Sequence, residues 1–368
     1  MSDLDSLREE IRRIDGELLR LVAERMETAK AIGQHKKEAG VPLRDWDVER
    51  QVLDRTERQA EVLGIPPKVT RALMQILIAA SREEQERLSY SSYRGAAESI
   101  LVVGGVGKMG RWLVNFFADQ GHRVTIFDPR AAAERNGSPV APAHTLADAL
   151  RGVTCACIAV SLDATPGVIA EIAASGFEGT VFDVASLKSH LKPAIEQARQ
   201  AGLAYTSIHP MFGPGARTLS DQVICICDCG RHEATAKVAG FFADTAATLV
   251  RLSLDEHDRI VSYVLGLSHL ANIVITKVLM ASGMEFGELN RIGSTTFHSQ
   301  MTTTSTVIQE DPNLYYAIQK LNPYSAALRE SFLTELTEIS DWIRDDDGAA
   351  FRDMMKDGRR WMKGDDTR

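Results

Sequence analysis

The first ninety residues repeat apolar positions with the period of an α-helix. From the start of the chain these positions recur in steps of three and four residues, at Leu4, Leu7, Ile11, Ile14, Leu18, Leu21 and Val22. This spacing predicts an amphipathic helix over residues 3–40, and similar patterns predict helices over 47–62 and 67–88. The first helix is too long to bury its apolar stripe within one chain, so we expect it to pair with a second copy.

The pattern then changes to short apolar runs alternating with helical stretches, with strands expected at 153–160, 180–184, 203–208 and 223–227. Such alternation predicts a parallel sheet with helices on both faces. From about Asp255 the pattern is helical again, at 257–279, 286–292, 312–320 and 323–342. We therefore expect a multidomain chain: an all-α three-helix domain (1–90), a linker (91–98), an α/β Rossmann-type domain (99–254) and an all-α dimerisation and substrate domain (255–368).

A glycine motif follows the first strand of the α/β region. The strand ends in Gly105-x-Gly107-x-x-Gly110, a helical segment follows, and the next strand ends at Asp128. This context is that of a dinucleotide-binding fingerprint, in which Gly105 permits a tight turn, Gly107 admits a pyrophosphate and Gly110 lets helix and strand pack closely. The expected cofactor-binding residues are Gly105, Val106, Gly107, Lys108, Met109, Gly110 and Asp128. Asp128 favours NAD over NADP, and Arg130 weakens that preference.

Three polar residues fall where strands of this sheet should end: Ser186, Lys188 and His209. Ligands of parallel α/β sheets bind outside the carboxyl ends of the strands, on the same edge as the glycine loop. A histidine at a strand end is often only structural, but the three side chains together beside a nicotinamide site make catalysis an equally good interpretation.

Composition narrows the function further. The net charge of −8 over 368 residues argues against a nucleic-acid partner. No uninterrupted apolar run reaches about eighteen residues, so no membrane span is expected. The charged N-terminus is no secretory signal, and an odd number of cysteines, five, indicates a reducing cytoplasm. The i, i+2 spacing of the cysteines is typical of core strand positions rather than of a metal site.

The polar residues of the N-terminal helices also form a pattern. Arg25 and Lys36 lie three helical turns apart, and the pairs Asp45/Glu49 and Ser81/Gln85 are each four residues apart, so each set shares a helix face. They fit a site for a small dianion that carries a hydroxyl group. On spacing alone, however, a helix surface with many salt bridges is the favoured interpretation.

Residues 4–88 resemble the all-helical chorismate mutases, through Leu7-Arg8-Glu9, Ala23-Glu24-Arg25, Gly33-x-x-Lys36, Arg44-Asp45 with Glu49, and Ser81-x-x-x-Gln85. The resemblance implies an intertwined homodimer in which Arg8 of the other chain and Arg25 bind the two carboxylates. It implies Lys36 and Gln85 at the ether oxygen, Asp45 and Glu49 near the ring hydroxyl, and Ser81 as a secondary contact. One departure is Val48, where the family usually has an arginine.

Residues 99–345 resemble the prephenate dehydrogenases, through the glycine motif, Asp183-x-Ala-Ser-x-Lys188, His209-Pro-Met-Phe-Gly-Pro214, Glu256-His257-Asp258 and Leu267-x-His269. The resemblance implies a bifunctional enzyme of tyrosine biosynthesis, which rearranges chorismate to prephenate and then oxidises and decarboxylates prephenate with NAD. It implies His209 as the general base, Ser186 bonded to the same hydroxyl or orienting His209, Lys188 as a nearby charge, and His269 in the substrate pocket.

A second departure leaves alternatives open. Thr306 stands where the family has an arginine that holds a substrate carboxylate, and a threonine cannot make that bidentate contact. Either Arg217, Arg291 or His298 supplies the charge, or the substrates are the ring-amino analogues, 4-amino-4-deoxychorismate and 4-amino-4-deoxyprephenate. A degenerate, nucleotide-binding regulatory relative is the non-enzymatic alternative. The retained His209 favours oxidation of a hydroxyl, so prephenate is the leading expectation.

Overall fold

The computed structural model of the chain describes residues 3–39, 46–89, 93, 95–130 and 144–364. The chain divides into two compact units. The first comprises Met1–Ser186 and Leu191–Ser253, and the second comprises Leu187–His190 and Leu254–Arg368. A short piece of the middle of the chain therefore packs with the C-terminal helices.

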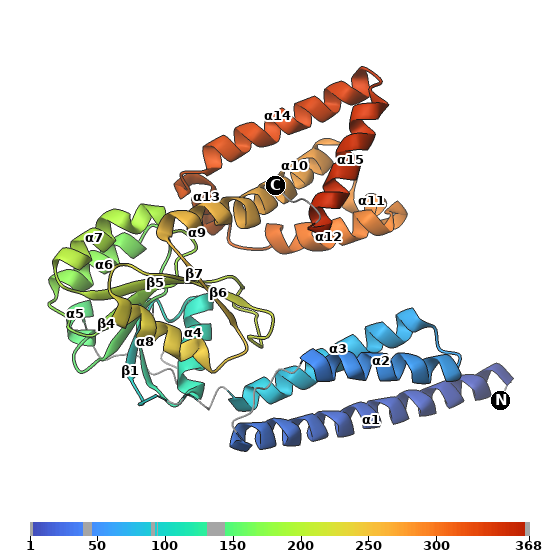
Figure 1. Cartoon of the computed structure of the whole chain (residues 1–368), viewed down its shortest axis with the longest axis horizontal. Coiled ribbons are helices and arrows are strands. Elements are labelled where there is room, and N and C mark those ends of the chain that lie inside the picture. Colours follow the sequence, from blue (N-terminus) through green and yellow to red (C-terminus); the bar gives the residue numbers. More distant parts are fainter. Residues whose placement is uncertain (1–2, 40–45, 90–92, 94, 131–143, 365–368) are drawn as a thin grey trace. The chain divides into compact units, whose positions relative to one another are not determined.

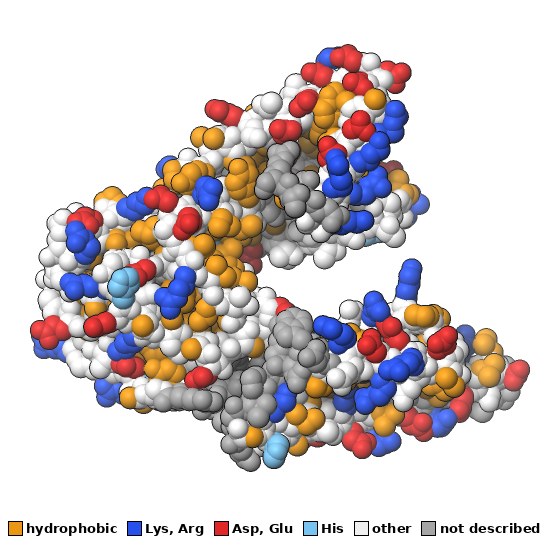
Figure 2. Space-filling model, viewed as in Figure 1, with side chains coloured by type: hydrophobic (Ala, Val, Ile, Leu, Met, Phe, Trp, Pro, Cys, Tyr) orange, Lys and Arg blue, Asp and Glu red, His pale blue; other side chains and the backbone are white. Residues whose placement is uncertain are grey.

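The N-terminal domain consists of three helices, α1 (Asp3–Ala39), α2 (Trp46–Val62) and α3 (Pro67–Ser89), which confirms the periodicity-based prediction to within one residue at each end. α3 packs along α1 and also contacts α2 (Figure 1). The apolar stripe of α1 stays at the surface, where Figure 2 shows apolar side chains among charged ones. Five of its members are more than half exposed in the single chain: Leu4, Leu7, Ile11, Leu18 and Leu21.

The α/β domain is built on a seven-stranded sheet of order β2-β1-β3-β4-β5-β6-β7. The strands are β1 (Ser99–Val103), β2 (Arg123–Phe127), β3 (Cys155–Ile158), β4 (Thr180–Asp183), β5 (Ala204–Pro210), β6 (Val223–Cys227) and β7 (Thr248–Leu252). The first five are parallel, so their carboxyl ends share one edge. The chain runs from β1 to β2 on one side and returns to β3 on the other, which places the topological switch point beside β1.

The expectation of an all-parallel sheet is wrong for β6, which runs antiparallel to β5 with His209 opposite Cys225. The connection between them, residues 211–222, carries no helix, whereas a parallel crossover usually runs through one. β7 went unrecognised in the sequence. The five cysteines are buried in this domain, as their spacing predicted, and burial raises the pKa of Cys155 to about 12.

Helices cover both faces of this sheet (Figure 1). α4 (Lys108–Asp119) and α8 (His232–Ala243) pack together through the stacked rings of Phe116 and Phe242, with centroids 5.0 Å apart. α6 (Thr165–Ala174) and α7 (Lys192–Gln200) contact each other, and short helical turns complete the layer at α5 (Leu146–Ala149) and η3 (Ser189–Leu191). The core between helices and sheet is aliphatic and aromatic, as a doubly wound fold requires.

The second unit is helical in the part of the chain that the structure describes. One long helix runs from Leu254 to Ala281 as α9 (Leu254–Val261), a π-helical segment η4 (Ser262–Leu267) and α10 (Ser268–Ala281). α11 (Phe286–Ile292), α12 (Thr295–Ile308), α13 (Pro312–Leu321), α14 (Ser325–Arg344) and α15 (Gly348–Lys363) follow. By length and composition the long helix could cross a membrane, but core helices of soluble proteins meet the same criteria.

Two of these helices were not predicted. α12 is rich in Ser and Thr, residue types that by intrinsic propensity favour caps and turns over helix interiors. α15 follows the acidic stretch Asp345–Asp347, and no element was expected there from the sequence. It is fixed at its start by Asp347, whose carboxylate accepts the Ala350 N–H at 3.0 Å, and at its end by Gly364 in the left-handed conformation.

Candidate active sites

The glycine loop after β1 is shaped by close backbone contacts. The residue with positive φ is Gly104 (φ +85°), so the turn assigned from sequence to Gly105 belongs to its neighbour. A Cβ on Gly105 would lie 2.7 Å from Ile126, and one on Gly110 would lie 2.3 Å from the Gly104 carbonyl oxygen. Gly107 ends the loop as the N-cap of α4, so the N–H groups of the first helical turn face the loop. This cradle, with no room for side chains, fits a pyrophosphate.

Asp128 lies directly after β2, at the same edge, and is almost fully buried. Its Oδ2 accepts the Val106 N–H at 3.3 Å, and its Oδ1 accepts the Arg130 N–H at 2.9 Å. Burial, the largest single effect, raises the pKa of Asp128, but the hydrogen bonds from Arg130 and Val106 together outweigh it and the pKa is lowered. A carboxylate therefore stands beside the glycine loop.

The ends of β4 and β5 present the predicted catalytic positions. In the register of this parallel pair Asp183 lies opposite Ser207, so Ser186 and His209 both come just beyond that level of the sheet. His209 is buried and Ser186 is half-buried. The buried Asp183 carboxylate accepts the Ala185 N–H at 2.9 Å and the Tyr205 hydroxyl. This anchor at the start of the β4 loop was not recognised in the sequence.

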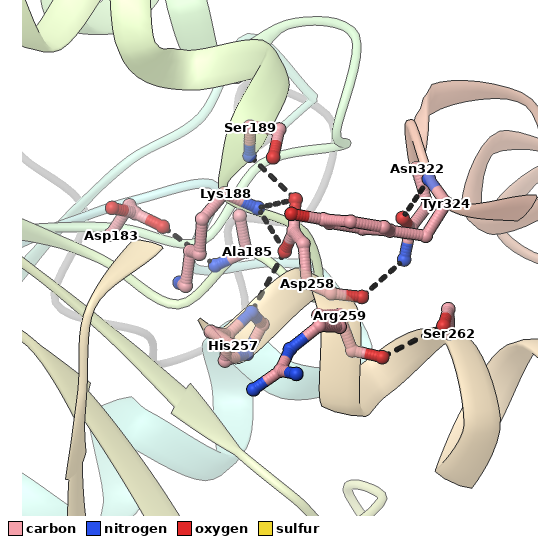
Figure 3. Close-up of polar contacts among 10 residues, drawn as sticks. All are labelled: Asp183, Ala185, Lys188, Ser189, His257, Asp258, Arg259, Ser262, Asn322 and Tyr324. Carbon is pink, nitrogen blue, oxygen red and sulfur yellow. Dashed lines mark hydrogen bonds and ion pairs between the residues drawn. The ribbon is translucent and has the colours of Figure 1, made fainter. Parts of the chain in front are cut away.

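Lys188 is fully buried in the segment that packs with the C-terminal helices. Its backbone N–H donates to Asp258 Oδ1 at 2.9 Å, and the Ser189 N–H donates to Asp258 Oδ2 at 2.6 Å. His257 Nδ1 lies 2.8 Å from the same carboxylate. Figure 3 shows both N–H groups directed at Asp258, while the Lys188 side chain runs away from it. The Glu256-His257-Asp258 motif was visible in the sequence, but nothing there assigned it a role.

His269 lies on α10 and packs against Tyr315 of α13, with ring centroids 4.2 Å apart and ring planes tilted by 34°. Burial lowers its pKa to about 4, so the imidazole is neutral at physiological pH. Thr306 is exposed on α12, and its hydroxyl donates to the Thr302 carbonyl. The side chains considered as its replacements, Arg217, Arg291 and His298, are also exposed in the single chain.

In the N-terminal domain α1 and α3 bring four of the predicted residues together. The Arg25 guanidinium donates to the Leu77 carbonyl at 2.6 Å and to the Ser81 hydroxyl. One helical turn further along α3, Gln85 packs against Gly33, where a Cβ would come within 3.0 Å of it. Lys36 follows Gly33 on α1 and is half-buried. Cationic and amide groups thus share the face between two helices.

The other predicted residues of this domain are placed differently. Arg8 is exposed near the start of α1, 3.6 Å from Asp5. Seventeen residues separate it from Arg25, roughly 25 Å of helix, so the two cannot meet in one chain. Val48 is half exposed on α2. Glu49 belongs to α2 but its side chain is not described, and Asp45 lies outside the described residues.

Two family models match the chain at its two ends. Residues 7–86 match the type II chorismate mutases, and residues 253–357 match the dimerisation domain of prephenate dehydrogenases. The first match covers the helices that carry Arg25, Lys36, Ser81 and Gln85, and the second covers the helices that carry Asp258 and His269.

Relatives and solved structures agree with these matches. A T-protein of Enterobacter agglomerans is 24% identical over 362 residues, 98% of this chain and 94% of its own length. A 4-amino-4-deoxyprephenate dehydrogenase of Streptomyces pristinaespiralis is 22% identical over 269 residues, 70% of this chain and 89% of its own length. The crystal structure of prephenate dehydrogenase from A. aeolicus in complex with hydroxyphenyl propionate and NAD+ has the same fold, with a TM-score of 0.60, 15% identity, and coverage of 74% of this chain and all of the other. The chain therefore belongs to the bifunctional family in which a type II chorismate mutase precedes a prephenate dehydrogenase.

Proposed function

We propose that this chain rearranges chorismate to prephenate and then converts prephenate to 4-hydroxyphenylpyruvate with NAD, in tyrosine biosynthesis. The observation that carries the proposal is the presence on one chain of both sets of groups. The Arg25–Ser81–Gln85 face lies between α1 and α3, and a side-chain-free glycine cradle shares a sheet edge with His209. Neither set serves the other's chemistry.

The mutase step needs no acid, base or nucleophile. A [3,3] rearrangement is accelerated when the substrate is held in a compact chair and donors stand where negative charge grows on the breaking C–O bond. We assign Arg25, and Arg8 from a second chain, to the two carboxylates. Lys36 and Gln85 would donate to the ether oxygen. Asp45 and Glu49 would lie near the ring hydroxyl, with Ser81 holding Arg25 in place.

In the dehydrogenase step the bound NAD supplies the hydride acceptor. The glycine cradle and the first turn of α4 would hold its pyrophosphate, and Asp128 its adenosine ribose. His209 accepts the proton of the substrate's C4 hydroxyl as the carbonyl forms, which is general-base work. Ser186 would bond the same hydroxyl, Lys188 would add positive charge, and His269 would line the substrate pocket. Loss of the ring carboxylate as CO₂ then makes the ring aromatic.

We further propose a homodimer as the working form, located in the cytoplasm. The match to a dimerisation domain supports pairing through the C-terminal helices. The exposed apolar stripe of α1 supports pairing in the N-terminal domain as well, because contiguous apolar surface of this kind is normally covered by a partner.

The test is to supply chorismate and NAD to the purified protein while following chorismate loss, NADH and product identity. We expect chorismate to disappear, prephenate to pass through as an intermediate, and one NADH to form per 4-hydroxyphenylpyruvate. Chorismate loss without NADH would remove the dehydrogenase half of the proposal. NADH from added prephenate, with no loss of chorismate, would remove the mutase half. If neither reaction occurs with these compounds or with their ring-amino analogues, the chain is a regulatory relative.

The ring-amino compounds are the second candidate, favoured by two observations. Thr306 replaces an expected arginine and is exposed, and one relative is a 4-amino-4-deoxyprephenate dehydrogenase. The same assay run with 4-amino-4-deoxychorismate decides between them by comparing kcat/KM. A higher kcat/KM for the amino compound would replace chorismate and prephenate as the natural substrates.

A further inference from the structure

The loop that joins β4 to η3 is fixed at both ends by buried carboxylates. At its start Asp183 accepts the Ala185 N–H and the Tyr205 hydroxyl. At its end Asp258, from α9, accepts the N–H groups of Lys188 and Ser189. Ser186 lies between the two anchors, and Lys188 belongs to the second one. A loop held only by solvent-exposed contacts would sample many conformations, whereas this one has backbone donors committed at each end.

The Asp258 anchor is built like a helix cap supplied from elsewhere in the chain. Ser189 begins η3, which leads into α7, and the first N–H groups of a helix have no partner within it. Asp258 comes from 70 residues further along the chain and is fully buried. Its backbone carbonyl also accepts the side-chain amide of Asn322 at 2.9 Å (Figure 3). Asp258 is therefore a hub joining the β4 loop, α9 and the α13–α14 connection.

A fully buried carboxylate is costly unless hydrogen bonds compensate for its lost hydration. Here burial is the largest effect on Asp258 and raises its pKa, but the bonds from His257, Ser189 and Lys188 outweigh it and the pKa is lowered. The carboxylate thus stays ionised, and its charge-assisted bonds hold the loop more tightly than neutral acceptors would. An apolar residue could fill this site without the desolvation cost of a carboxylate. The charge at position 258 therefore does more than fill space.

We propose that Asp258 is a positioning residue of the dehydrogenase reaction: by clamping the Lys188 and Ser189 N–H groups it fixes the direction in which the Lys188 side chain leaves the loop and the place of Ser186. The proposal rests on the proposed dehydrogenase function. Displacement of catalytic groups by about 1 Å can cost on the order of 100-fold in rate. Loss of the clamp should therefore lower kcat rather than binding of NAD.

The test compares Asp258→Asn with two matched variants. Asp255→Asn makes the same change at an exposed acid on the same helix. Asn322→Ala removes the bond to the Asp258 carbonyl, together with the bond that Asn322 Oδ1 accepts from the Tyr324 N–H, and leaves the carboxylate clamp in place. The measurements are kcat and KM for prephenate, the dissociation constant of NAD by calorimetry, thermal unfolding, and amide hydrogen exchange of a peptide spanning residues 186–191.

We expect Asp258→Asn to lower kcat about 10- to 100-fold and to speed exchange at Lys188 and Ser189, with NAD affinity and chorismate loss within twofold of wild type. Asn322→Ala should lower the unfolding temperature with kcat within twofold, and Asp255→Asn should change neither. Should Asp258→Asn not fold, Ser189→Pro replaces it, because proline is tolerated in the first turn of a helix and removes one donor of the clamp.

Two results would overturn the inference while leaving the proposed function standing. One is faster exchange with unchanged kcat. The other is a kcat loss in Asn322→Ala as large as in Asp258→Asn, which would make the hub a matter of stability alone. A wild-type protein that binds NAD but forms no NADH from prephenate would instead overturn the proposed function, and this role with it.

Discussion

The guanidinium of Arg130 lies edge-on to the carboxylate of Asp128, with Nε 3.2 Å from Oδ1 and Nη2 3.2 Å from Oδ2. Nη2 also lies 3.8 Å from the position that a Cβ on Gly107 would occupy, so the cation stands beside the glycine loop. The acid expected to favour NAD is thus paired with the cation two residues further along the chain. An arginine in such a place can also bind the 2′-phosphate of NADP.

Replacing Arg130 should sharpen the choice of cofactor. In Arg130→Ala we expect the ratio of kcat/KM for NAD to that for NADP to rise at least about tenfold, which corresponds to roughly 1.4 kcal/mol. The reason is that Asp128 then faces the ribose uncompensated and repels a phosphate. Calorimetric dissociation constants for the two cofactors give the same ratio without turnover. An unchanged ratio would mean that Arg130 swings clear when cofactor binds.

His209 should be needed for oxidation alone. In His209→Asn the side chain keeps hydrogen-bonding capacity but cannot take up a proton, so NADH formation from prephenate should fall by about 10²- to 10⁴-fold. Chorismate loss should stay within twofold of wild type, measured on the same preparation. Equal loss of both activities in a folded protein would contradict the separation of the two sites.

Lys36 should be needed for rearrangement alone. Removing a donor from the breaking bond in Lys36→Ala should slow chorismate loss by about 10²- to 10³-fold and leave NADH formation from added prephenate unchanged. Lys30→Ala is the matched control, because Lys30 is an exposed lysine on the same helix. A similar loss in both variants would point to disruption of α1 rather than to the pocket.

The Tyr205 hydroxyl should stabilise the α/β domain through Asp183. Tyr205 is almost fully buried and donates to a buried carboxylate, so Tyr205→Phe leaves that carboxylate short of a donor. We expect a loss of about 1–3 kcal/mol in the free energy of unfolding, followed by the urea-induced transition of this domain. Tyr263→Phe, at an exposed tyrosine, should be neutral. Equal stability of the two variants would mean that water replaces the lost donor.

The half-buried His269 should make the free energy of unfolding depend on pH in the acid range. Its pKa is lowered by burial from 6.5 to about 4, so between these values the unfolded chain binds more protons than the folded one. The stabilisation that neutral His269 gives the folded state is therefore fully present above about pH 6.5. It is lost as the pH falls toward 4, at no more than about 1.4 kcal/mol per pH unit. In His269→Phe that part of the pH dependence should vanish from thermal unfolding curves; an unaltered slope would assign it to other groups.

Local patterns predicted the helices of the N-terminal domain and most of the sheet because their periods are unambiguous. Apolar spacing placed α1, α2 and α3 within a residue, and β6 was predicted with its observed bounds. The antiparallel direction of β6 could not be read the same way, since strand direction depends on how residues 211–222 connect. The Ser/Thr-rich helix α12 was not predicted for a related reason, because tertiary packing overrode its weak helix propensity.

In the candidate sites, the sequence predicted the positions of the motifs but not the contacts that hold them in place. The glycine motif gave the cradle, although its turn falls on Gly104, one residue earlier than expected. The Glu256-His257-Asp258 motif was visible, but the bond from Asp258 to the Lys188 N–H joins residues 70 positions apart. Such pairings depend on the three-dimensional path of the chain, which no single-sequence pattern encodes.

The placement of Arg8 far along α1 from Arg25 has a consequence for how the first activity responds to protein concentration. In the proposed dimer, Arg8 of one chain completes the site that holds Arg25 of the other chain, so a lone protomer would lack a complete site. Chorismate turnover per chain should accordingly fade when the protein is diluted below its self-association constant. The glycine cradle and His209 lie within one protomer, so dilution should reduce NADH formation from added prephenate less than it reduces chorismate loss.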